Sequence, residues 1–222
     1  MARIARVVIP DIPHHVVQRG VRRMQVFFSD ADREEYLSLL SAEAKKRGLE
    51  FLAWCLMSNH VHLVVVPRHE RSLAASLGEA HRKYTSKINM REGCRGHLWQ
   101  ERFHSYPLDD SHLMAAVRYV EVNPVRAGLV ERAQDWEWSS ARFHLGLEKS
   151  DRLLSEGALV GLVDDWQSLL ENEITPKGEK IELHLRTGRP FGPFWFVEKL
   201  EKLVGRKLRP SRGGWPKGKK RK

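Results

Sequence analysis

The chain has 222 residues, of which 41% are hydrophobic and 30% are charged. This length and composition allow one packed core and exclude a largely disordered protein. No apolar run approaches the roughly 20 residues of a membrane-spanning helix, and the N-terminus lacks a signal-peptide pattern. Two isolated cysteines, Cys55 and Cys94, argue against a disulfide framework or a thiolate zinc site, so we expect a cytoplasmic protein without membrane contact.

The net charge of +10 is concentrated at the C-terminal end of the chain. Residues 206–222 hold nine lysines and arginines and no acidic residue, which leaves +1 for the rest. Glycines and prolines among these cations predict a disordered basic tail that binds nucleic-acid phosphates, or one that only keeps the protein soluble. The candidate nucleic-acid contacts in this tail are Arg212, Lys217, Lys219 and Lys220.

The chain begins with a predicted strand and helix. Residues 14–20 form a short strand pattern that ends at a glycine. Ser29 or Asp30 can cap a helix that runs to about Arg47, because apolar residues recur at helical spacing and a glycine follows.

The central part of the chain predicts a hairpin, a second helix and a fourth strand. Residues 49–56 and 60–66 are apolar runs joined by a short turn, which is typical of a β-hairpin. A helix is predicted over 72–90, and after a glycine-rich loop a strand is predicted over 97–106. A third helix should start at Asp109 or Asp110 and end near 122, since Pro124 disfavours helical backbone just before it.

This order of elements predicts an α+β protein. It matches the ferredoxin-like split βαβ pattern, an antiparallel sheet with helices on one face. Beyond it, residues 153–170 and 193–204 have helical patterns. We therefore expect a catalytic domain over 1–145, a small helical C-terminal region over 146–205, and the disordered basic tail over 206–222.

Two histidines, His60 and His62, stand at the start of the second hairpin strand. Residues i and i+2 of a strand point to the same face, so both imidazoles can reach one cation. A hard cation such as Mg²⁺ or Mn²⁺ would take an amide or carboxylate oxygen as a further ligand. The alternative is a chance pair in which a hydrogen bond satisfies each ring.

Tyr119 and Asn123 are four residues apart on the third predicted helix, so they lie on one face. A metal that polarises a phosphodiester beside a tyrosine would compensate for the weak nucleophilicity of a phenol. Asn123 could hold that metal while Tyr119 attacks phosphorus. The alternative is a half-buried aromatic and a helix-ending asparagine before Pro124.

Together these segments resemble a known family. The HVH motif at 60–62, preceded by CLMSN, and YVEVNPVRAGLV at 119–130 resemble the HUH single-tyrosine transposases, and more closely their REP-associated tyrosine transposase branch. VVQRG, VFFSDADREEYL, LWQERFHSYPLDD and WEWSSAR are also similar to that branch. The resemblance covers roughly residues 1–145.

The resemblance implies a role for each motif residue. His60 and His62 would bind Mg²⁺ or Mn²⁺ together with Asn123, where other single-tyrosine relatives often carry glutamine. Tyr119 would cleave single-stranded DNA through a 5′-phosphotyrosine intermediate and free a 3′-OH for strand transfer. The expected partners are REP-like palindromic hairpins, and we expect nucleoid association. Relatives in insertion sequences are commonly dimers, whereas the REP-associated branch implies a monomer.

Residues around this predicted site are candidate DNA contacts. Arginine can donate two hydrogen bonds to a phosphate or a guanine, and aromatic rings can stack on unpaired bases. Trp99 could equally belong to the core. Two other functions stay open: a non-catalytic hairpin DNA-binding protein that keeps the fold, and an RNA-binding relative. The candidate contacts before the tail are Gln18, Arg19, Arg82, Lys83, Trp99, Arg102, His104 and Arg126.

Overall fold

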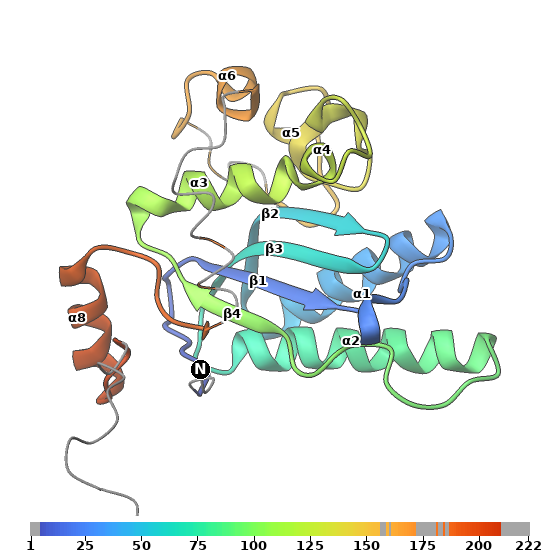
Figure 1. Cartoon of the computed structure of the whole chain (residues 1–222), viewed down its shortest axis with the longest axis horizontal. Coiled ribbons are helices and arrows are strands. Elements are labelled where there is room, and N and C mark those ends of the chain that lie inside the picture. The colour runs from blue at the N-terminus through green and yellow to red at the C-terminus, as the bar shows by residue number, and fades with distance from the viewer. Residues whose placement is uncertain are drawn as a thin grey trace, which may run out of the picture.

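The computed structural model describes residues 5–155, 159, 161–171, 181, 184 and 187–209. Its centre is a four-stranded antiparallel sheet in the order β2-β3-β1-β4 (Figure 1). This is the strand order of a ferredoxin-like split βαβ fold, so the predicted α+β class is confirmed. The strands are β1 (His14–Arg19), β2 (Leu49–Met57), β3 (His60–Pro67) and β4 (His104–Pro107).

Two helices cover one face of the sheet: α1 (Asp30–Arg47) and α2 (Ser72–Arg91) (Figure 1). Helix α1 begins at Ser29 with a capping box, in which Ser29 and Asp32 exchange hydrogen bonds between side chain and backbone. It ends at Gly48, whose φ of 63° is left-handed and favours glycine. Local signals in the sequence therefore fix both ends of this helix.

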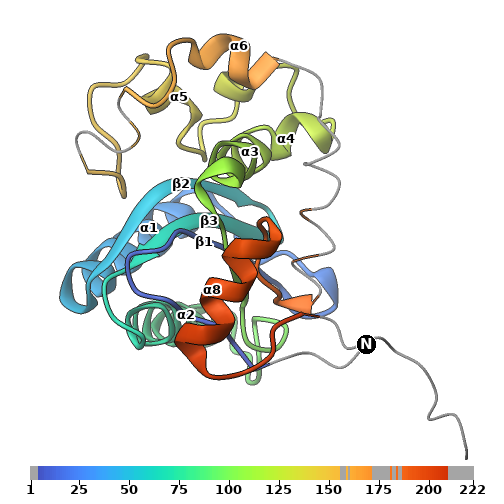
Figure 2. The ribbon, with the colours of Figure 1, turned by 90° about the vertical axis from the view of Figure 1, so that its left-hand side faces the viewer.

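Helix α3 (Asp110–Glu121) lies across the opposite face, and a short helix, α4 (Asn123–Arg126), follows it (Figures 1 and 2). The prediction of helices on one face thus holds for α1 and α2 but not for α3. The third helix ends at Glu121 with Val122 as its C-cap, close to the predicted end near 122. Pro124 lies in the first turn of α4, where its missing N–H costs no hydrogen bond.

Alternation along β3 separates the two faces of the sheet. Val61, Leu63 and Val65 pack towards α1 and α2, whereas Val64 packs towards α3. His62 shares the α3 side with Val64 because side chains two apart in a strand point the same way. The apolar run of β3 is long because both of its faces are covered.

The fourth strand is shorter than predicted. It spans only His104–Pro107, so the prediction of a strand from residue 97 was wrong. Glu101 has a φ of 55°, which breaks extended backbone, and Trp99 instead packs among aromatic rings of α1 and α2. An isolated bridge joins Trp99 to Gly20, where an added Cβ would meet the Met24 carbonyl oxygen at 2.2 Å.

Short helices fill the remaining turns. They are η1 (Val21–Arg23), η2 (Ala133–Asp135), α5 (Ala141–His144), α6 (Trp166–Glu171) and α8 (Phe194–Val204). The predicted helix over 153–170 was wrong in its described part, since only α6 is helical there. Gly161, with a φ of 77°, lies outside the helical region. The predicted helix over 193–204 is confirmed as α8.

The C-terminal elements pack in two different places (Figure 2). Helix α6 lies beside α3, where the Arg118 guanidinium donates to the Leu169 carbonyl. Helix α8 packs against the N-terminal Val7 and Ile9. Of the predicted tail, 206–209 is described: Leu208 is buried in this same cluster, and Arg206 donates to backbone carbonyls of the N-terminal segment.

No helix in the described part of the chain is long and apolar enough to cross a membrane.

Candidate active site

His60 and His62 lie at the start of β3, on the face that α3 covers. Their ring centroids are 4.9 Å apart. His62 is 2% exposed and His60 is half-buried. In the antiparallel register, Arg19 is opposite His60 and Val17 is opposite His62. The sheet therefore brings the predicted histidine pair and the end of β1 to one place.

Hydrogen bonds orient both histidine rings. His62 Nδ1 lies 3.2 Å from His15 Nε2, and His15 Nδ1 lies 2.8 Å from the Tyr106 hydroxyl. His60 Nδ1 lies 2.6 Å from Asn59 Oδ1, an acceptor, so this nitrogen carries the proton. In each ring Nδ1 is engaged within the protein, which leaves Nε2 to face the site.

The predicted tyrosine and asparagine reach the same cluster from α3 and α4. The Tyr119 ring centroid is 5.6 Å from that of His62, and Tyr119 is 6% exposed. Asn123 Nδ2 lies 3.5 Å from His62 Nε2. The Arg126 guanidinium carbon lies 4.5 Å from the Tyr119 ring centroid, so a cation covers the tyrosine.

The electrostatics of the site keep its imidazoles neutral. Burial lowers the pKa of His15 to about 3. Burial, followed by the positive charge of Arg19, lowers the pKa of His60 to about 4, against a smaller opposing effect of a hydrogen bond to Asn123. Burial, His60 and His15 lower the pKa of His62 well below its usual value. All three rings therefore carry lone pairs at neutral pH.

These residues fit a divalent cation. No group of three or more His, Cys, Asp or Glu side chains among the described residues could hold a metal, so a third ligand must be of another type. Asn123 contacts both histidines, and its amide can be turned to present oxygen, since amide N and O are exchanged by a flip. The amide oxygen suits Mn²⁺ or Mg²⁺, and the two neutral imidazoles supply nitrogen ligands of the kind that divalent transition metals accept.

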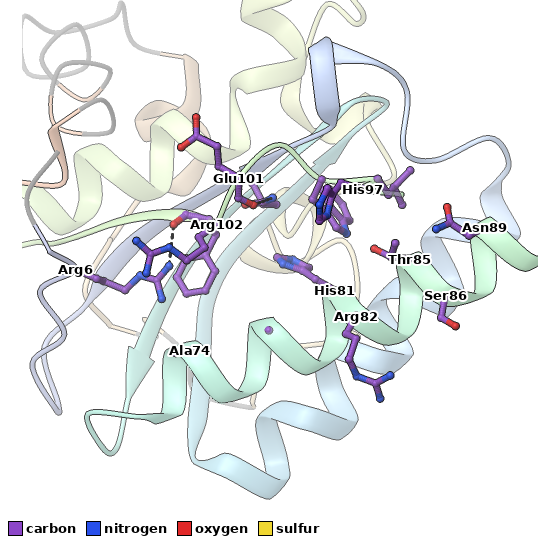
Figure 3. A pocket seen from close by; sticks show the side chains of 15 residues that line it. Arg6, Ala74, His81, Arg82, Thr85, Ser86, Asn89, His97, Glu101 and Arg102 are labelled. Atoms are coloured by element: carbon purple, nitrogen blue, oxygen red, sulfur yellow. Dashed lines mark hydrogen bonds between the residues drawn. The ribbon is translucent and has the colours of Figure 1, made fainter. Parts of the chain in front are cut away.

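The predicted DNA contacts divide between the two faces of the sheet. Arg19 and Arg126 lie at the histidine cluster, where both depress the pKa of His62. His104 is half-buried at the start of β4. Four others line a cavity on the α2 side (Figure 3): Gln18, Arg82, Trp99 and Arg102.

The other predicted DNA contacts are Lys83, which pairs within the protein, and the four residues of the tail. Lys83 forms an ion pair with the carboxylate of Glu43, which is buried, so Lys83 helps to join α1 and α2. The four tail residues Arg212, Lys217, Lys219 and Lys220 lie outside the described residues.

His15 and Tyr106 are site neighbours that sequence reasoning missed. Both are fully buried. His15 lies on β1, which pairs with β3, and Tyr106 lies on β4, which pairs with the other edge of β1. The available signal was the period of two in β1, which puts His15 on the same face as Arg19. The register that brings His15 to His62 is a tertiary contact and has no local signature.

The fold and the site define a transposase. The family model described as "Transposase IS200 like" matches residues 9–123, more than half of the chain, and the chain belongs to this family. The match ends at Asn123, so it includes His60, His62 and Tyr119.

Within that family the chain is similar to REP-associated tyrosine transposases. One from Escherichia coli K12 is 24% identical over 102 residues, which cover 45% of this chain and 58% of that protein. A Haemophilus influenzae protein provisionally given the same description is 26% identical over 121 residues, covering 50% of this chain and 68% of that protein. The solved structure of a REP-associated tyrosine transposase bound to a REP hairpin superposes with a TM-score of 0.58 at 18% identity, over 79% of this chain and 100% of that one, which supports the fold.

Proposed function

We propose that this protein is a divalent-metal-dependent endonuclease and strand transferase that acts on single-stranded DNA. The observation that carries the proposal is the convergence of His60, His62, Tyr119 and Asn123 on one sheet face, from the three elements β3, α3 and α4. A protein that only binds DNA needs no phenol beside two neutral imidazoles and an amide.

In this mechanism Tyr119 is the nucleophile. Its hydroxyl oxygen attacks a phosphodiester, the bond from phosphorus to the 3′ oxygen breaks, and the tyrosine holds the 5′ phosphate covalently. The 3′ oxygen leaves with a proton, and a later attack by a 3′-OH on the tyrosyl phosphate rejoins a strand. The bond energy is conserved in the ester, so the reaction needs no nucleotide triphosphate.

The chain's other groups orient the substrate. Arg19 and Arg126 supply positive charge on two sides of the cluster, which attracts the scissile phosphate. His60, His62 and Asn123 would hold Mg²⁺ or Mn²⁺, which would stabilise developing charge on phosphate oxygens. Burial of Tyr119 at 6% exposure limits access of water to the ester.

The substrate class that we propose is a short palindromic DNA hairpin with unpaired flanks. A REP-associated relative has been solved with a REP hairpin, and the fold of this chain is similar to that structure. We further propose a cytoplasmic monomer associated with the nucleoid. The alternative is a hairpin-binding protein, of DNA or RNA, that keeps the fold without the chemistry.

The test is a search for a covalent protein–DNA adduct. Purified protein is incubated with Mn²⁺ and a labelled single-stranded hairpin, and a denaturant-resistant adduct is sought. We expect an adduct with the native protein, none with Tyr119→Phe, and none with EDTA. An adduct that persists in Tyr119→Phe would exclude this nucleophile. Tight binding without any adduct would favour the alternative.

A further inference from the structure

A cavity of about 790 Å³ lies between α2 and residues 97–103 (Figure 3). Gln18 lines it from β1, and the next residue, Arg19, points to the opposite face of the sheet. This cavity, called the α2 cavity, and the histidine cluster therefore lie on opposite faces of the sheet, at the same end of it. The volume of the α2 cavity is in the range of small-ligand sites.

Two polar groups in the wall of the cavity lack partners. Gln18 Oε1 and Trp99 Nε1 are buried and have no hydrogen-bond partner within the described part of the chain. Gln18 is 1% exposed and Trp99 is 7% exposed. Buried acceptors and donors are normally satisfied, so a ligand of this cavity that reached these two groups would gain a donor and an acceptor that the described chain does not use.

The floor of the cavity contains a glycine that packing does not require. Gly78 lies in the interior of α2, where glycine is less favourable than alanine. A Cβ added there would meet no atom within 4 Å. Ala74, one turn earlier, is also small and lines the same cavity. The helix surface is therefore left open for a bulky, flat group.

The rim of the cavity is cationic. The Arg6 guanidinium carbon lies 3.6 Å from the Phe103 ring centroid. Arg102 and Arg82, both exposed, also line the cavity (Figure 3). Glu101 is the acidic residue among those that line the cavity. This charge suits a phosphate, while the ring of His81, 4.8 Å from that of Trp99, adds an aromatic wall.

The segment that carries Trp99 is held by long hydrogen bonds and contains a residue with positive φ. Glu101 has a φ of 55°, a strained conformation for a residue with a side chain. Gln18 Nε2 holds this segment through the carbonyls of Gln100 and Glu101, both at 3.3 Å, which is long for such bonds. Rotation of the Gln18 amide would expose the polar edge of the wall.

We propose that the α2 cavity binds one unpaired nucleotide of the single-stranded DNA substrate. The base lies over Gly78 beside Trp99, and its phosphate lies at the arginine rim. A nucleobase edge carries both a donor and an acceptor, which match Trp99 Nε1 and Gln18 Oε1. The inference rests on the proposed function, because it takes single-stranded DNA as the substrate.

The test fills the cavity without disturbing the fold. Gly78→Leu adds a side chain over the floor, and Gly78→Ala is the matched control, which should raise the melting temperature or leave it unchanged. Binding is measured in EDTA, to prevent cleavage, with one hairpin that has unpaired flanks and the same hairpin without them. We expect Gly78→Leu to weaken binding of the flanked hairpin by about tenfold or more, with no change for the blunt one.

A second readout locates the nucleotide. 2-Aminopurine is placed at each unpaired position in turn, and its fluorescence should be quenched at one position in the native protein and in Gly78→Ala but not in Gly78→Leu. Trp99→Phe, which keeps the ring and removes the indole N–H, should reduce affinity for the flanked hairpin only.

Each failure has a distinct meaning. Unchanged binding by Gly78→Leu would overturn the assignment of the cavity. Equal losses for both hairpins would overturn capture of an unpaired nucleotide. If the native protein bound neither hairpin, the proposed function would fall with the inference, whereas loss of the tyrosyl adduct alone would leave the cavity result standing.

Discussion

His62 is held from both edges of its ring. Its Nδ1 faces His15, which in turn faces the Tyr106 hydroxyl, and its Nε2 faces Asn123. His15 is neutral and therefore carries a single ring proton. If that proton points to Tyr106, His62 Nδ1–H donates to His15 and the lone pair of His62 Nε2 faces the site. In that arrangement the chain of hydrogen bonds selects the His62 tautomer that can bind a metal.

At this scale we predict that His15→Phe weakens Mn²⁺ binding by about 10- to 100-fold, because the tautomer and orientation of His62 are no longer fixed. Isothermal titration calorimetry with Mn²⁺ measures the effect without DNA. His14→Phe is the matched control, since His14 is equally buried but bonds to the Ile12 carbonyl and the Ile9 N–H. Equal losses in both variants would contradict a specific role for His15.

At the scale of elements, a buried polar cluster anchors the end of the tyrosine helix. Glu121 is fully buried two residues after Tyr119, and its Oε1 accepts from Ser140 and lies 2.6 Å from His144 Nδ1. The His144 ring stacks on Trp166 with centroids 4.2 Å apart, which ties α5 to α6. The segment after α4 therefore anchors the last residue of α3.

We expect Glu121→Ala to lower the free energy of unfolding by about 1–3 kcal/mol, because it leaves the Ser140 and His144 groups buried without their partner. The rate of adduct formation by Tyr119 should fall as well, since the nucleophile is carried by the same helix. Urea denaturation and the adduct assay measure the two effects. Glu137→Ala removes an exposed carboxylate nearby and should change neither.

At the scale of the whole molecule, buried histidines make stability depend on pH. Burial lowers the pKa of His14 to about 4 and that of His15 and His81 to about 3. Above pH 6.5 all three are neutral in both the folded and the unfolded state. Below 6.5 the unfolded chain takes up protons that the folded protein excludes, so acid favours unfolding.

Above pH 6.5 these three histidines should therefore not make the free energy of unfolding depend on pH. From pH 6.5 down to about pH 4 it should fall by up to about 1.4 kcal/mol per pH unit for each histidine. Urea denaturation between pH 5 and pH 6.5 measures this slope above the main range of carboxylate titration. His81→Gln should reduce the slope by the contribution of one histidine, which is up to about 1.4 kcal/mol per pH unit. An unchanged slope in that variant would contradict buried, neutral His81.

The sequence by itself determined most of the elements and predicted the residues that gather at the candidate site. Ser29 and Gly48 are local signals for the ends of α1, and the alternation of β3 put His60 and His62 on one face. The same reasoning placed Tyr119 beside Asn123. These features follow from periods of 2 and 3.6 residues and from capping chemistry, which short stretches of chain contain in full.

Only the tertiary structure decided which faces meet. The register of β1 against β3 brings His15 to His62, and the packing of α3 across that face brings Tyr119 to both. The Trp99 segment was predicted as a strand, yet it turns into an aromatic core and opens the α2 cavity. Local periodicity fixes the direction of a side chain, but the pairing of distant segments depends on the total burial that the whole chain achieves.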